Sequence, residues 1–202
     1  MAAGQPSPRY TAVAVFLHWI MALGIIALAV IGLTMTHVKL KPFDLFKLYQ
    51  LHKSIGITIL LAAFLRLAWR LAHHPPSLPA AMSPLERKAA ETSHFLLYGL
   101  LFVLPFTGWA VVSAAPLNIP TVLYGLVPWP HLPILSTLHN KAPVEHVLAR
   151  THDYLAFALI ALVTLHAAAA LRHHLWLRDD VLTRMLPRGR GHQSETANRD
   201  KL

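Results

Sequence analysis

Hydrophobic residues in this chain are gathered into four long blocks separated by shorter polar or proline-rich stretches. The blocks cover about residues 10–36, 48–71, 92–115 and 147–175. A helix needs about 20 mostly apolar residues to cross the hydrocarbon core of a bilayer. Its backbone groups must be paired within the segment, because lipid offers them no partner. The pattern therefore predicts an all-α membrane protein, a bundle of four transmembrane helices.

The connections between the blocks differ in length and character. Residues 37–47 and 72–91 are short and polar, whereas residues 116–146 form a longer, proline-rich and partly apolar loop. We predict one membrane domain over residues 1–188 and a basic, polar, disordered tail over residues 189–202. The first block holds a histidine and no small-residue cleavage site follows it, so we predict a retained helix and not a signal peptide.

The composition also favours the bilayer as the environment of this chain. Hydrophobic residues make up 55% of it and charged residues only 13%, whereas a soluble domain carries about 25% charge. The chain has no cysteine, which excludes disulfides, iron–sulfur clusters and heme attached through C-x-x-C-H. The net charge of +9 comes from Lys and Arg at the edges of the apolar blocks. This placement indicates contacts with membrane lipid and no nucleic-acid partner.

The distribution of Lys and Arg predicts how the chain is oriented in the membrane. The N-terminus, the 72–91 connection and the C-terminus share a face with twelve Lys and Arg, and the opposite face has six. Cytoplasmic segments carry the excess of positive charge, so both termini are predicted to be cytoplasmic. The basic residues of the outer face are Lys39, Lys41, Lys47, Lys53, Lys141 and Arg150.

Four histidines within the apolar blocks can be compared by their membrane depth, and ionisable residues inside a membrane are costly and tend to mark function. His18 and His166 lie toward the cytoplasmic side, and His52 and His152 toward the outer side. His152 and His166 are fourteen residues apart, roughly 21 Å and four turns of helix, so they point to nearly the same side. Depth and helix direction together predict two pairs, His18 with His166 and His52 with His152.

Two imidazole pairs at two depths of a helix bundle are what two hemes require. Bundle cores build cofactor sites from inward side chains on facing helices, and imidazole is an axial ligand of heme iron. With both axial positions filled, a heme transfers electrons by an outer-sphere route, so no catalytic side chain is expected. Two alternatives remain open at this point: the histidines are interfacial hydrogen-bonding residues, or the chain is a helical bundle or transporter without heme.

Other polar residues near the pairs have more than one reading. His94 matches the depth of His18, so it could replace a ligand or form a hydrogen bond with a heme propionate or a quinone. The histidines of the outer loop are predicted to be exposed and solvated: His131, His139 and His146. Those on the cytoplasmic side are predicted to be surface residues: His73, His74 and His192. The basic residues that flank the pairs could bind propionates, but headgroup anchoring is favoured for most of them: Lys53, Arg66, Arg70, Arg150 and Arg172.

Several short patterns in this chain resemble the bacterial cytochrome b561 family. They are R-Y-x7-H-W from Arg9, L-H-K-S-I-G from Leu51, T-H-D from Thr151, L-H-A-A-A-A-L-R-H-H from Leu165 and D-x-x-L-x-R-M-L-P-R from Asp179. The resemblance covers about residues 9–188. It implies a four-helix diheme membrane protein whose two b hemes are held through the iron by His18, His52, His152 and His166.

The resemblance also implies an activity and a location. Its best-understood members are similar to superoxide oxidase, which takes electrons from superoxide at the periplasmic face and delivers them to ubiquinone. The position that matches the quinone-binding histidine is His173. On this reading the chain is a superoxide:ubiquinone oxidoreductase of the bacterial inner membrane, and no redox partner protein is required. The alternative is a membrane-anchor cytochrome b subunit that links a hydrogenase- or formate dehydrogenase-like partner to the quinone pool.

Overall fold

A computed structural model describes residues 9–79 and 82–187 of the chain. Its four long helices are α1 (Ala12–His37), α2 (Pro42–Ala72), α3 (Pro84–Ala114) and α5 (Ala142–Arg172). Each is long and apolar enough to cross a membrane. The predicted fold class, a four-helix membrane bundle, is therefore confirmed. The tail predicted to be disordered lies outside the described residues.

Three of the helices begin five to eight residues before the apolar blocks do, at Pro42, Pro84 and Ala142. Their first turns are polar and contain a proline, which suits the start of a helix because its missing N–H has no partner to lose there. In α3 the start is fixed by a capping box, in which the side chains and backbones of Ser83 and Glu86 bond one another. Such polar turns lie outside the hydrophobic blocks, so hydrophobic length alone does not predict them.

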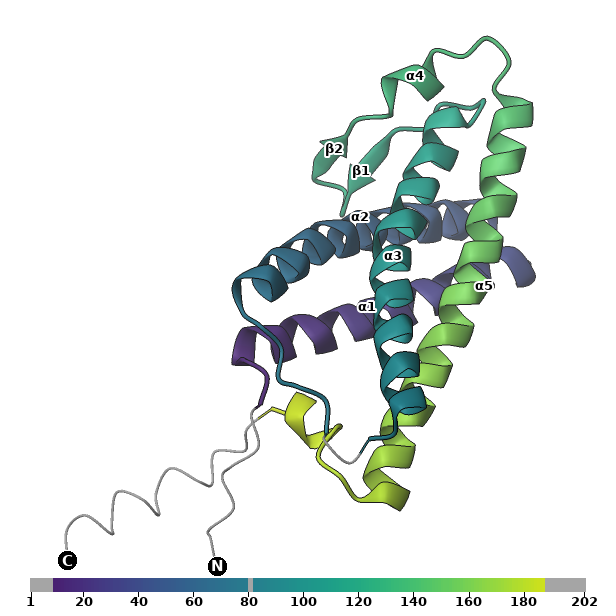
Figure 1. Ribbon diagram of the computed structural model, residues 1–202. Coiled ribbons are helices and arrows are strands. Elements are labelled where there is room, and N and C mark those ends of the chain that lie inside the picture. The colour runs from purple at the N-terminus through teal and green to yellow at the C-terminus, as the bar shows by residue number, and fades with distance from the viewer. Residues whose placement is uncertain (1–8, 80–81, 188–202) are drawn as a thin grey trace, which may run out of the picture.

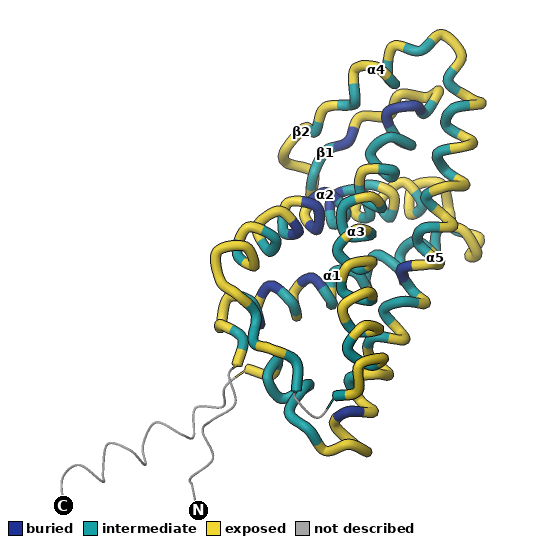
Figure 2. The backbone as a smooth tube through the Cα atoms, viewed as in Figure 1, coloured by how far each residue is buried: buried dark blue, intermediate teal, exposed yellow. Residues whose placement is uncertain are grey.

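The helices form two antiparallel pairs that cross each other (Figure 1). Helix α1 packs against α2, α3 packs against α5, and the two pairs meet where α2 contacts α3. Figure 2 shows that few positions are buried and that most of these lie on α1 and α2. A small core joins Met21, Ile59 and Ala63. Large apolar side chains instead face outward on every long helix, as lipid-facing surfaces require: Phe16, Leu61, Phe95 and Leu165.

The connection between α3 and α5 is folded against the helices and is not an open loop. It contains a two-stranded antiparallel hairpin of β1 (Thr121–Leu123) and β2 (Val127–Trp129), followed by the single-turn helix α4 (Pro133–Ser136). The turn uses left-handed backbone at Tyr124 and Gly125, and the glycine adopts it without steric cost. The hairpin is tied to α2, because Gln50 Nε2 donates to Pro120 O and Tyr124 N donates to Ser54 Oγ, each over 2.9 Å.

The opposite end of the bundle is closed by the segment after α5. That helix continues into a π-helical turn, η1 (His173–Leu177), and a 3-10 turn, η2 (Thr183–Met185), follows it. Arg9 donates to the carbonyl oxygens of Thr183 and Leu186, and Trp19 Nε1 donates to Met185 O over 2.7 Å. The first and last described residues therefore lie at one end of the bundle, which we call the inner end; the hairpin marks the outer end.

Candidate functional site

The four membrane histidines lie as two pairs in the structure. The ring centroids of His18 on α1 and His166 on α5 are 6.3 Å apart, and those of His52 on α2 and His152 on α5 are also 6.3 Å apart. The ring planes are inclined by 67° and 76°. Both pairs bridge the two crossing halves of the bundle, because each joins one histidine of α1 or α2 to one of α5.

The spacing of each pair suits a metal ion held between the rings. An imidazole nitrogen binds a transition metal at about 2.0–2.1 Å, and the ring centre lies roughly 1.1 Å behind that nitrogen. Two imidazoles on opposite sides of one metal therefore have centroids separated by about 6.3 Å. Within residues 9–79 and 82–187, no group of three or more histidine or acidic side chains is arranged to hold an ion alone. Each pair could thus supply two imidazole ligands to a group that would bring the remaining ligands of its own metal.

The outer pair opens onto a cavity of about 650 Å³ that is lined by all four long helices. Its volume lies within the range of about 300–1,000 Å³ that is usual for cofactor and ligand sites. The lining is mostly apolar, with His52 and His152 among the few polar side chains. Four buried polar atoms near this end have no hydrogen-bond partner in the described part of the chain: His52 Nδ1, Thr121 Oγ1, Trp129 Nε1 and His131 Nε2. Such atoms are rare in native proteins, where a bound group or an ordered water usually satisfies them.

Helix α3 orients the ring of His152. The Thr107 hydroxyl lies 2.8 Å from Leu104 O, to which it donates, and 3.1 Å from His152 Nδ1. With its proton on Nδ1, His152 donates to Thr107 and presents the Nε2 lone pair, which is the form that binds metal. Gly108 makes room for the ring, since a Cβ at that position would lie 2.9 Å from His152 Cε1. His52 rests in a similar way against Gly32 of α1, where a Cβ would lie 3.5 Å from His52 Cε1.

The inner pair lies in a more basic environment. Arg66 of α2 reaches α1, where its guanidinium donates to Ala14 O and lies 3.4 Å from His18 Nδ1. His94 of α3 is a third imidazole at this depth, with its ring centroid 5.5 Å from that of His166. This separation is shorter than the spacing of about 6.3 Å for two ligands across one metal. Of the rings near His166, His18 has the spacing of a ligand.

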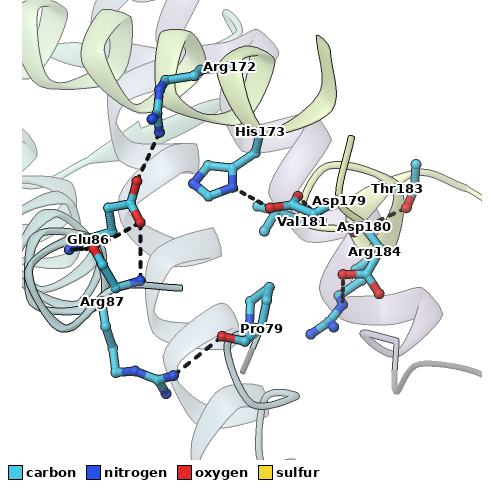
Figure 3. A network of polar contacts seen from close by, with 11 residues as sticks. Pro79, Glu86, Arg87, Arg172, His173, Asp179, Asp180, Val181, Thr183 and Arg184 are labelled. Atoms are coloured by element: carbon cyan, nitrogen blue, oxygen red, sulfur yellow. Dashed lines mark hydrogen bonds and ion pairs between the residues drawn. The ribbon is translucent and has the colours of Figure 1, made fainter. Parts of the chain in front are cut away.

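Figure 3 shows the polar network at the inner end, where His173 lies. His173 is buried at the start of η1, and its Nδ1 is bonded to the carboxylate of Asp179. Beside it, Arg172 pairs with Glu86 of α3 over 3.0 Å, and Arg184 pairs with Asp180 over 2.9 Å. A histidine held by a carboxylate through Nδ1 has a fixed ring orientation and is left with Nε2 for a further partner. The predicted quinone-binding residue therefore occupies an ordered polar site.

The structure revises the reading of one loop histidine. His139 and His146 are exposed as predicted, and so are His73 and His74. The prediction of a solvated ring is wrong for His131, which is only partly exposed and has a buried Nε2. Burial lowers the pKa of His131, and nearby Lys53 and Lys141 lower it further. The folded loop accounts for this difference, because it shields His131 from water.

Four residues around the outer pair were not identified from the sequence: Thr107, Gly108, Thr121 and Trp129. Gly108 and the nearby Pro105 both lie within α3, which continues through them to Ala114. A polar threonine followed by glycine within an apolar helix is the signal that could have pointed to a ring contact. Thr121 and Trp129 gave no comparable signal, because their roles depend on how the loop folds.

Comparison with known proteins gives the same family that the short sequence patterns resemble. The profile of the prokaryotic cytochrome b561 family matches residues 9–188. Cytochrome b561 homolog 2 of Escherichia coli K12 is 31% identical over 178 residues, which cover 88% of this chain and 91% of that protein. The probable superoxide oxidase CybB of Yersinia pestis is 28% identical over 189 residues, with 91% and 98% covered. Cytochrome b561 homolog 1 of E. coli K12 is 24% identical over 186 residues, with 89% and 98% covered.

Proposed function

This chain belongs to the prokaryotic cytochrome b561 family of membrane electron-transfer heme proteins, and we propose that it is a diheme superoxide:ubiquinone oxidoreductase of the bacterial inner membrane. The observation that carries the proposal is the pair of equal 6.3 Å imidazole separations, one near each end of the bundle. Two redox sites at two depths can connect a substrate on one side of the membrane with one on the other.

We assign His18 and His166 to the inner b heme, and His52 and His152 to the outer one. Bound b hemes supply one-electron transfer, and with two imidazoles on each iron they have no open position for oxygen. The protein contributes the ring orientation, through Thr107 and Gly108 for His152. It also contributes an apolar surround of four helices, which keeps water from the outer site.

The outer surface is suited to a small anion. Six basic residues lie on the predicted outer connections and helix ends, against three acidic ones, Asp44, Glu145 and Asp153. A surplus of positive charge raises the local concentration of an anion such as superoxide and speeds its encounter with the protein. The similarity to a probable superoxide oxidase supports this choice of electron donor.

The inner end is suited to quinone. Asp179 holds His173 through Nδ1, so Nε2 can donate to a quinone carbonyl oxygen when the ring is protonated. Asp179 then neutralises the imidazolium charge, and the pair can pass a proton to the reduced quinone. Each quinol requires two electrons and two protons, and two superoxide ions supply the electrons while becoming two molecules of oxygen.

The proposed activity is tested by mixing the purified, heme-loaded chain with superoxide and a soluble ubiquinone. We expect rapid heme reduction followed by quinol formation, with one quinol for two superoxide ions. An Asp179→Asn variant should keep heme reduction by superoxide and slow quinol formation, because His173 loses its counter-ion. Rates no faster than spontaneous dismutation would contradict the proposed activity while leaving the heme assignment intact.

A milder prediction concerns Thr107. Replacing it with valine keeps the shape of the side chain but removes the acceptor of the His152 N–H, so the imidazole becomes a weaker electron donor to the iron. We expect both hemes to remain bound and the midpoint potential of the outer heme to rise by roughly 40 mV, which corresponds to about 1 kcal/mol for one hydrogen bond. A Thr107→Ser variant, which retains the hydroxyl, should stay near the wild-type potential in a redox titration.

A further inference from the structure

We propose that the hairpin of the α3–α5 connection, together with Lys53, forms an oxyanion site that holds a propionate of the outer heme. The inference rests on the proposed heme assignment and adds a role for residues of the outer loop. Its starting point is the pair of buried hydroxyl and indole groups, Thr121 and Trp129, that have no partner within the described chain.

Thr121 and Trp129 are cross-strand partners in the hairpin. Residues directly opposite each other in an antiparallel pair project from the same face, with their Cβ atoms roughly 5 Å apart. Both residues line the cavity that contains His52 and His152. The hairpin therefore places two side chains that carry polar groups side by side at the wall of this cavity.

The two groups are buried and unsatisfied. Thr121 is 3% exposed, and neither its Oγ1 nor the buried Nε1 of Trp129 has a hydrogen-bond partner among residues 9–79 and 82–187. An indole N–H can only donate, and a threonine hydroxyl can donate as well as accept. A group that satisfies both must therefore offer acceptor atoms, and a carboxylate has two acceptor oxygens.

Positive charge is provided by Lys53, the residue after the heme-ligand candidate His52. Lys53 lines the same cavity, and its Nζ lies 3.4 Å from the carbonyl oxygen of Pro120, directly before Thr121. In the described part of the chain this long contact uses one donor of the ammonium group, and the others can bind an anion. Hydrogen bonds from charged and neutral donors to a carboxylate are among the stronger ones in proteins.

The site is also held in place before any ligand arrives. Gln50 and Ser54 of α2 bond the backbone of the hairpin at Pro120 and Tyr124. Trp109 of α3 donates to Pro130 O over 2.9 Å and packs edge-on against Trp129, with ring centroids 5.6 Å apart. The donors are thus fixed between α2 and α3, next to the outer imidazole pair.

A propionate fits this site better than a freely diffusing anion does. The donors line the cavity that the outer heme would occupy, and the porphyrin carries its own carboxylates. Neutralising a propionate stabilises the reduced heme, since the electron is added next to less negative charge. Removing the donors should therefore lower the potential of the outer heme.

The test compares the full-length, heme-loaded Thr121→Val/Trp129→Phe double variant with wild type in a spectroscopic redox titration. Both substitutions keep the apolar shape and remove only the polar group. At fixed ambient potential we expect the oxidised-to-reduced ratio of the outer heme to rise about tenfold, or about 59 mV for a one-electron couple, with the inner heme unchanged. The Tyr124→Phe variant is the control, because its hydroxyl bonds Thr58 at 2.7 Å and does not line the cavity.

The outcomes separate this proposal from its rivals. A shift in the double variant that is absent in Tyr124→Phe supports the propionate site. An unchanged potential with slower reduction by superoxide would overturn it in favour of a docking site for the substrate. If neither the potential nor the rate of reduction by superoxide changed, the proposal would be overturned, and ordered water would be the partner of Thr121 and Trp129. In both contrary cases a wild-type protein with two hemes would leave the proposed function standing.

Discussion

Purified His152→Ala protein is expected to contain one heme in place of two, with the spectrum of the inner heme unchanged. In the proposed assignment His152 and His52 would both hold the outer heme, with their ring centroids 6.3 Å apart, and the substitution would leave that heme with one protein ligand in place of two. The inner pair uses another helical turn of α5 and a different partner, His18. The loss should therefore be confined to one site and appear as half the wild-type heme content per chain.

Two further variants complete this experiment. His166→Ala should remove the inner heme and keep the spectrum of the outer heme, which His152→Ala is expected to lack. His94→Ala should keep both hemes, because its 5.5 Å separation from His166 is too short for a ligand across the metal. A His139→Ala variant, at an exposed position of the outer loop, is the reference and should also keep both hemes. Loss of both hemes from His152→Ala together with a folded bundle, or loss of one from His94→Ala, would contradict the assignment.

The second large effect is expected at Gly108. An alanine there would place its Cβ 2.9 Å from His152 Cε1, closer than such atoms approach each other. The His152 ring cannot move away freely, because its Nδ1 is bonded to Thr107, the residue before Gly108 on α3. We expect Gly108→Ala to weaken heme binding at the outer site by roughly 10–100-fold, the usual range for losing support around a metal ligand. Heme content and the rate of heme transfer to apomyoglobin measure this.

Gly99→Ala is a closely matched control. Gly99 lies on the same helix, and a Cβ there would meet nothing within 4 Å. Both substitutions replace glycine in a helix interior, which favours the helix by about 1 kcal/mol. Only Gly108→Ala adds a contact with His152. Equal heme retention in the two variants would show that Gly108 does not shape the outer site.

The sequence predicted the features that follow from length and helical period. Four apolar blocks were enough to predict four helices, because a bilayer permits few other structures. The fourteen residues between His152 and His166 fix their relative direction and depth on any regular helix. The pairs with His18 and His52 follow from the up-and-down order of the helices, and the structure places each pair at the same 6.3 Å separation.

Other features depend on contacts between segments far apart in sequence. The Thr107–Gly108 support of His152 arises from the packing of α3 on α5, which no pattern within α3 specifies. The hairpin that pairs Thr121 with Trp129 has three-residue strands and a Tyr-Gly turn, too short for a periodic signal. Its docking on α2 also explains why His131 is shielded. These tertiary contacts determine the outer site in detail.

In the proposed assignment, one chain holds two b hemes through its two histidine pairs. The most direct test is a reduced-minus-oxidised spectrum of the purified full-length chain, combined with heme and protein quantification by the pyridine hemochrome method. We predict two low-spin b-type hemes per chain. A spectrum without heme bands, or a preparation saturated at one heme per chain, would contradict the claim.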